Sequence, residues 1–251
     1  MTTTKTTRIL VWDLPTRLFH GLLALAFVGA WGIATAVDDD SALFPVHALF
    51  GLVMAFMVAL RLVWGVVGTR HARLSALLVG PRAVAAYVVG VFRGTGGRHT
   101  GHNPGSAVAI VAIFAEVAVL TVTGVLMGSG SHAAKEVHEV FATLLLVTVL
   151  LHVAGVVIHS LRFKENLAMS MVDGRKVGDE GAAIRGARPL VALAFLALTA
   201  LWGAGLASGY DGATRRVTLP VVGQTLDLGE VEGGERGGGG HHGRRHGDDD
   251  D

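Results

Sequence analysis

Five long apolar stretches run through this 251-residue sequence and restrict the folds open to it. They cover residues 18–37, 46–67, 107–127, 137–158 and 190–206. Each has close to the ~17–25 residues that an α-helix needs to cross a bilayer, and the fifth is the shortest. Charged residues make up 16% of the chain, well below the roughly 25% of a soluble domain. The sequence therefore predicts an all-α membrane protein, with a four-helix transmembrane bundle and a fifth transmembrane helix.

The distribution of lysine and arginine predicts an orientation. Most basic residues lie in three segments, which alternate with two links that hold one lysine between them. The basic segments are 1–17, 68–106 and 159–189, and the links are 38–45 and 128–136. Because basic residues near helix ends stay on the cytoplasmic side, we expect a cytoplasmic N-terminus. The tail after the fifth helix is then outside, although Arg215 and Arg216 close to that helix argue against this placement.

The N-terminal region also has features of a cleavable signal peptide. Basic residues and an apolar stretch precede Ala34, Thr35 and Ala36, a small-residue pattern typical of a cleavage site. The apolar stretch is longer than the ~7–15 residues of a signal core, and cleavage would disturb the charge alternation. We therefore expect this stretch to remain as the first transmembrane helix.

Four histidines fall at two depths in the predicted bundle. His138 and His152 are fourteen residues apart, which on a helix places them on one face with about 21 Å between them along the axis. Successive helices cross in opposite directions. His47 therefore lies at the same depth as His138, near the outer face of the membrane (the outer level), and His20 at the same depth as His152, near the cytoplasmic face (the inner level). Two imidazoles from different helices at one level can bind a haem iron from both axial sides. The sequence thus predicts an outer and an inner haem site.

Other assignments of the histidines are weighed against haem ligation. A single histidine near a helix end is commonly an interfacial residue whose polar tip reaches water. Structural zinc needs four ligands together, which two pairs roughly 20 Å apart cannot supply. His159 is the rival ligand at the inner level and His132 at the outer level. The chain has no cysteine, so any haem would be of the non-covalent b type.

Several short motifs accompany these histidines between residues 9 and 177. They are VWDLPTRLFH at 11–20, RLVWG at 61–65, GTRHAR at 68–73, GHNP at 101–104, ENL at 165–167 and GRK at 174–176. His47 lies four residues before Gly51. Together these motifs resemble the bacterial cytochrome b-561-like proteins and the cytochrome b subunit of nickel–iron hydrogenases, a family of di-haem membrane proteins.

The resemblance implies two b haems near opposite faces of the bacterial inner membrane. The matching ligand positions are His20, His47, His138 and His152. It also implies that electrons pass between quinol or quinone and a redox partner protein, such as cytochrome c or a hydrogenase. Two alternatives stay open: a membrane anchor subunit of a larger redox complex, and an oxidoreductase acting on superoxide or quinone. The formal net charge of +1 gives no reason to expect binding of nucleic acid.

Other polar residues are weaker candidates. Glu116, mid-way along the third stretch, could relay a quinol proton or be a neutral acid bonded to a neighbouring helix. Four arginines near the inner level could bind haem propionates or be solvated: Arg17, Arg61, Arg70 and Arg73. The loop histidines His71, His99 and His102 could help a quinol proton leave. Residues 82–93 are expected to form a short interfacial helix.

The predicted organisation has four parts. Residues 1–17 form a cytoplasmic segment, 18–177 the di-haem core, 178–206 a linker with the fifth helix, and 207–251 a low-complexity tail that we expect to be disordered. From residue 229 the tail consists mainly of glycine, histidine, arginine and aspartate. Such a composition cannot bury a core, so we expect disorder there, with loose binding of a divalent metal as the alternative.

Overall fold

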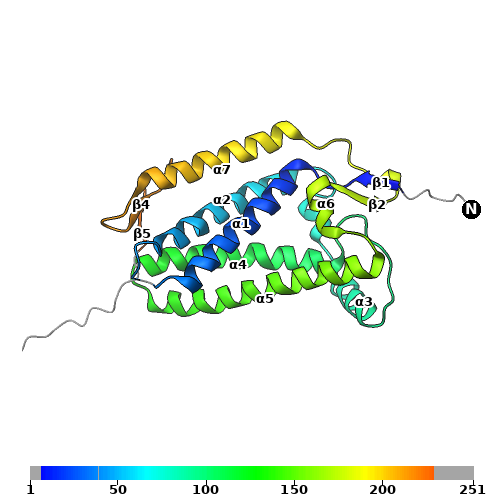
Figure 1. Cartoon of the computed structure of the whole chain (residues 1–251), viewed down its shortest axis with the longest axis horizontal. Coiled ribbons are helices and arrows are strands. Elements are labelled where there is room, and N and C mark those ends of the chain that lie inside the picture. The colour runs from blue at the N-terminus through cyan, green and yellow to red at the C-terminus, as the bar shows by residue number, and fades with distance from the viewer. Residues whose placement is uncertain (1–6, 39, 229–251) are drawn as a thin grey trace, which may run out of the picture.

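Five long helices run the length of the molecule (Figure 1). The structure is a computed structural model that describes residues 7–38 and 40–228. The long helices are α1 (Leu14–Ala36), α2 (Pro45–Val67), α4 (Pro104–Gly128), α5 (His132–Phe163) and α7 (Pro189–Gly209). Each is long and apolar enough to cross a membrane. They coincide with the five predicted stretches and confirm the helical membrane fold.

Polar caps and prolines determine where two of these helices begin. Asp13 accepts a hydrogen bond from the Thr16 N–H at 2.9 Å, and Asn103 accepts one from the Ser106 N–H at 2.8 Å. Each cap satisfies an N–H group that has no partner within its helix. A proline follows in the first turn, where its missing N–H is not needed. The WDLP and HNP motifs are thus helix starts.

The five helices share one apolar core. Phe19, Met57, Val117, Leu145 and Phe195, one from each long helix, are buried in it. The rings of Phe19 and Phe195 meet edge to face with 6.2 Å between centroids, which fixes α7 against α1. Many other large apolar side chains are exposed on the outside of the bundle. Hydrocarbon tails accept such a surface, because they are as apolar as leucine.

Short elements close one end of the bundle, which we call the β1–β2 end. Strand β1 (Thr7–Leu10) pairs antiparallel with β2 (Arg175–Gly178), and α6 (Leu167–Asp173) precedes β2. Helix α3 (Pro81–Phe92) lies at the same end (Figure 1) and matches the short helix predicted at residues 82–93. Two 3-10 helices, Leu74–Leu77 and Glu180–Ala182, lie in the connecting segments.

Three strands form a small antiparallel sheet at the other end, the β3–β5 end. They are β3 (Tyr210–Asp211), β4 (Arg216–Thr218) and β5 (Thr225–Asp227), in that order across the sheet. Arg215 contacts the Asp40 carbonyl, so the sheet lies at the same end as the link between α1 and α2. The sequence predicted the chain after α7 at this same end, because successive transmembrane helices run in opposite directions.

The sheet corrects the predicted tail. Residues 207–228 were expected to belong to a tail without structure, but they end α7 and form the three strands. The reason is a small core in which Leu206, Val217 and Leu226 are buried. Strands of two or three residues are too short to show a clear alternation in the sequence. The low-complexity part, residues 229–251, lies outside the described residues.

Candidate functional site

Two histidines meet near the β3–β5 end of the bundle. His47 lies in the first turn of α2 and His138 in the second turn of α5. Their ring centroids are 6.2 Å apart, and the ring planes are inclined at 68°. Phe44 stacks on His47 with 5.8 Å between centroids. The structure thus brings together the two side chains that the sequence placed at the outer level.

The imidazoles of this pair are oriented through their Nδ1 atoms. His47 Nδ1 donates to the Ala30 carbonyl of α1 at 2.8 Å. His138 Nδ1 lies 3.0 Å from Thr123 Oγ1 of α4. That hydroxyl already donates to the Val119 carbonyl at 2.8 Å, so it accepts from His138. With Nδ1 as the donor in both rings, Nε2 is the atom that carries a lone pair for a metal.

The distance between these two rings fits one metal ion held by both. Metal–imidazole bonds are about 2 Å long, so two axial imidazoles on one ion have centroids roughly 6 Å apart. The observed 6.2 Å agrees with this value. Axial imidazoles whose second N–H is hydrogen-bonded are the donor set that a b haem requires. Among residues 7–38 and 40–228 no cluster of three or more histidines or carboxylates could hold a metal without such a cofactor.

The second pair, His20 of α1 and His152 of α5, lies nearer the β1–β2 end. The two imidazoles are close enough to interact electrostatically. His20 is exposed and His152 is half-buried. Because His138 and His152 belong to the same continuous helix, the two pairs are separated by about 21 Å along α5. The four predicted ligands therefore form two pairs at different depths.

The four candidate arginines at the β1–β2 end have different surroundings. Arg17 and Arg70 donate to backbone carbonyls of segments far along the chain, and Arg73 donates to the carbonyl of Gly68 in its own loop. Arg61 is 3% exposed, and its Nη1 has no hydrogen-bond partner among the described residues. A buried guanidinium N–H without a partner is costly unless an anion binds it. Arg61 is thus the arginine best suited to hold a carboxylate ligand.

Asp13 links three elements beside Arg61. Its Oδ1 caps α1, and its Oδ2 accepts from Trp64 Nε1 at 3.1 Å and from Thr69 Oγ1 at 2.6 Å. The side chain is 1% exposed and interacts electrostatically with Arg61. Asp13 is a buried polar residue whose role was not predicted from the sequence. Its place before Leu14 and Pro15 was the available signal, since aspartate followed by proline is typical of a helix start.

Glu116 lies in the middle of α4 and is 4% exposed. Its Oε1 accepts a hydrogen bond from Thr148 Oγ1 of α5 at 2.8 Å. Thr148 is one turn from His152, so the carboxyl group lies between the two histidine levels. Its Oε2 has no hydrogen-bond partner within the described part of the chain. The contact with α5 corresponds to the expected alternative of an acid bonded to a neighbouring helix.

Trp12 is the centre of a buried cluster at the β1–β2 end. His102 packs on its ring with 4.7 Å between centroids, and His71 lies 6.2 Å away. Lys176 Nζ lies 5.8 Å from the centre of the indole ring. Burial, reinforced by the charges of Arg61 and Lys176, lowers the pKa of His102 to about 3. Burial also lowers the pKa of His71, so both rings are neutral at pH 7.

A cavity of about 330 Å³ lies between α3, the loop at residues 95–104 and the end of α5. Its polar side chains are those of Tyr87, Thr95, His99, His159 and Arg162. His99 Nδ1 and His159 Nε2 are buried without a hydrogen-bond partner among the described residues. Burial and the charge of Lys176 lower the pKa of His99. The rival inner ligand His159 thus lines this cavity, and the rival outer ligand, at position 132, is exposed.

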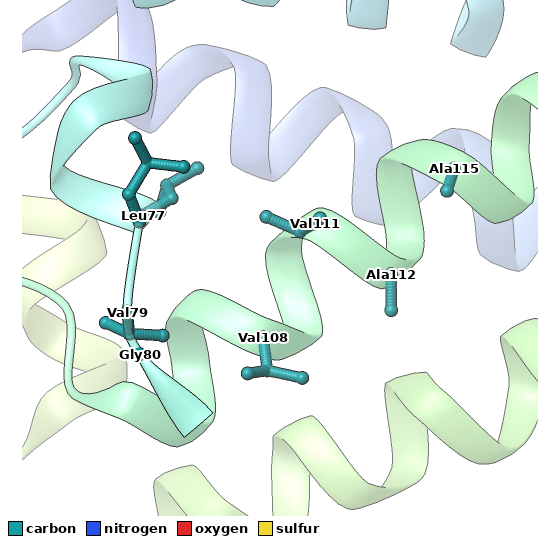
Figure 2. A pocket seen from close by; sticks show the side chains of 8 residues that line it. Leu77, Val79, Gly80, Val108, Val111, Ala112 and Ala115 are labelled. Atoms are coloured by element: carbon teal, nitrogen blue, oxygen red, sulfur yellow. The ribbon is translucent and has the colours of Figure 1, made fainter. Parts of the chain in front are cut away.

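A second hollow, of about 610 Å³, is apolar. It lies between residues 77–80 and the first part of α4 and is lined by Leu77, Val79, Val108, Val111 and Ala112, among others (Figure 2). None of its lining residues is titratable. It therefore offers an apolar surface and no chemistry of its own.

The comparisons with known proteins agree with this arrangement. Residues 11–174 match the family model of prokaryotic cytochrome b561. The chain belongs to this family. The matched segment contains all four paired histidines and ends before α7. No curated protein and no solved structure matches the chain.

As a prokaryotic cytochrome b561, the chain is a multi-pass bacterial membrane protein. Membership implies that it binds b-type haem and takes part in transmembrane electron transfer. The family expected from the sequence motifs is thereby confirmed. The β3–β5 sheet and α7 lie outside the matched residues, so the family says nothing about them.

Proposed function

We propose that this cytochrome binds two b haems and carries electrons between the quinone pool and a redox partner protein, such as a cytochrome c or a hydrogenase. The observation that carries the proposal is the division of four histidines into two pairs at different depths of one bundle. His47 and His138 would hold the outer haem iron. His20 and His152 would hold the inner one.

The protein's part in this chemistry is to orient the ligands and to set the local charge. Bound haem supplies the one-electron redox chemistry. The hydrogen bonds to the Ala30 carbonyl and to Thr123 fix the rings of His47 and His138 and raise the basicity of their Nε2 atoms. At the inner level, the buried Nη1 of Arg61 would bind a propionate. The arginines at positions 17, 70 and 73 would be further partners.

The β1–β2 end is proposed to face the cytoplasm, with the protein in the bacterial inner membrane. The described parts of the basic segments, residues 7–17, 68–106 and 159–189, join the helices at this end, and residues 40–45 of the acidic link lie at the other. Basic residues near helix ends are retained on the cytoplasmic side during insertion. The pair of His20 and His152 would then be the cytoplasmic one.

The cavity between α3 and α5 is where we propose that the quinone head group binds. His99 and His159 lie in its wall with ring nitrogens that have no partner within the described part of the chain. A neutral imidazole can accept a proton from a quinol hydroxyl as the quinol is oxidised. His159 lies seven residues after His152 on α5, about 10 Å along the helix, so the cavity is next to the inner pair.

Purified holoprotein in detergent tests the proposal. We expect a reduced b-type spectrum, two haems per chain, and reduction by a soluble quinol analogue. The change His159→Phe should slow this reduction at least about tenfold and leave the haem content unchanged. His132→Phe, an exposed site on the same helix, is the matched control. A protein without haem, or one that quinol does not reduce, would contradict the proposal.

The same preparation separates the two alternatives. A membrane anchor would still pass electrons to its partner complex after His47 or His138 is replaced. An oxidoreductase acting on superoxide would turn over with quinone and superoxide when no partner protein is added. The proposed role requires electron transfer to stop in the first experiment, and it requires a partner protein in the second.

A further inference from the structure

Strand β4 and the turn after it run back along the end of α7. A Cβ atom at Gly209 would lie 2.5 Å from the Thr218 carbonyl oxygen, and one at Gly205 would lie 2.6 Å from Pro220 Cγ. The four helical residues from Gly205 to Gly209 and the two extended residues from Thr218 to Pro220 each cover about 6–7 Å. The strand therefore follows the helix backwards, from its end toward the middle of the bundle. Two glycines on one helix face permit this approach because neither has a side chain.

The hairpin of β4 and β5 changes polarity along its length. At its open end Arg216 pairs with Asp227 at 3.2 Å. Val217 and Leu226 are buried next to them. No charged residue occurs between positions 217 and 226. The charged end of the hairpin thus lies at the end of α4, where the Asp227 carbonyl is next to Gly128, and its uncharged turn lies beside α7.

The turn itself exposes two valines. Val221 is 103% exposed and Val222 is 67% exposed. The φ angle of Val221 is +69°, in the left-handed region that a β-branched residue rarely adopts. Turns that face water usually have glycine or asparagine at such a position. Neither the exposure nor the backbone conformation of Val221 is what a turn in water would favour.

We infer that this turn is inserted into the lipid at the β3–β5 face of the membrane, with Val221 and Val222 against acyl chains. Gly205 is four residues inside the end of a membrane-spanning helix, so the turn beside it lies about 6 Å deeper than that end. Apolar segments in an interface reach about 5–10 Å into the boundary between head groups and acyl chains. The valines also continue the lipid-facing surface of α7, on which Leu201 is 69% exposed.

An inserted turn gives the β3–β5 sheet a second attachment to the membrane. The first attachment is α7 itself, which ends at Gly209 and leads directly into β3. With the turn held in lipid, the sheet is fixed flat against the membrane face, at the end of the bundle where His47 and His138 lie. Lipid is thus the partner of this surface.

Single-cysteine labelling tests the inference cleanly, because the chain has no cysteine of its own. The full-length, haem-loaded Val221→Cys protein is labelled with bimane and reconstituted into phosphatidylcholine vesicles. Lipids brominated on the upper part of the acyl chain should quench its fluorescence at least about twofold. Iodide in the aqueous phase should have little effect. The matched control is Ala213→Cys, an exposed site in the β3–β4 turn, which iodide should quench strongly and brominated lipid should not.

Two results would overturn the inference. Equal quenching of both labelled proteins by iodide would place the turn in water. Protection of the Val221→Cys label from both iodide and brominated lipid would place the turn against a protein surface, such as a second copy of this chain. The haem absorption spectrum of each labelled protein verifies that it is folded.

Discussion

Individual hydrogen bonds orient the imidazoles at the β3–β5 end. Thr123→Val removes the acceptor of the His138 Nδ1–H bond and changes the side-chain volume little. We expect about 10–100-fold weaker haem binding at this level, the usual effect of losing such a bond. Transfer of haem to excess apomyoglobin measures the affinity. Thr121→Val, whose hydroxyl donates to the Val117 carbonyl, is the control. Equal weakening in both variants would point to helix packing.

The buried His102 makes the stability of the protein depend on pH. Its pKa of about 3 in the folded protein lies below the ~6.5 of an unfolded chain. Between these values the unfolded state binds a proton that the folded state does not. The contribution of this residue to stability is therefore complete above about pH 6.5 and falls as the pH decreases, with a loss of about 1 kcal/mol at pH 5.5.

Thermal unfolding in detergent at several pH values measures this effect. The midpoint of the wild-type protein should fall between pH 7.5 and 5.5, and the fall should be smaller in His102→Gln. The comparison uses the slope with pH, because the substitution also changes the packing on Trp12. The same slope in both proteins would show that His102 binds a proton equally well in the folded and unfolded states.

Asp13 caps α1 and also accepts hydrogen bonds from two other side chains, so its loss should cost more stability than the loss of a simple cap. Asp13→Ala removes the cap and leaves Trp64 Nε1 and Thr69 Oγ1 without their acceptor. We expect a loss of at least about 2 kcal/mol of stability. Asn166→Ala, which removes the cap of the short helix α6, should cost about 1 kcal/mol. Unfolding midpoints of both variants test this order, and a smaller effect at Asp13 would contradict it.

Elements with a strong apolar pattern could be predicted from the sequence, and short ones could not. All five long helices and α3 follow from continuous hydrophobic stretches and their flanking charges. The pairing of β1 with β2 depends on contacts between residues more than 160 positions apart, for example Arg8 with Asp173 at 2.5 Å. The sheet after α7 depends on a core of three side chains. Neither has a local signal.

The candidate site likewise has one part that could be predicted from the sequence and one part that could not. The histidine levels could be derived because helix direction and position along each helix determine depth. The hydrogen bonds of Asp13 and the cavity at His99 and His159 depend on which loop side chains pack against the end of the bundle. The sequence does not show these contacts. Loop histidines such as His102 are solvated in most proteins, so the sequence alone could not show that this one packs on Trp12.

The two ends of the whole molecule are expected on opposite sides of the membrane. Ser129→Cys, in the exposed loop before α5, should react with a membrane-impermeant maleimide in intact cells. Ala183→Cys, exposed at the β1–β2 end, should react after the membrane is permeabilised. The reverse pattern would mean that the N-terminus is outside and would exchange the proposed inner and outer sites.

The haem content of single histidine variants tests most directly whether two haems are held at separate levels of one bundle. His138→Ala should retain one haem per chain, with the spectrum of the inner site, and His152→Ala should retain one with the spectrum of the outer site. His132→Ala, exposed on the same helix, should retain both haems. Loss of both haems from His138→Ala, or retention of both, would contradict the pairing of His47 with His138 and of His20 with His152.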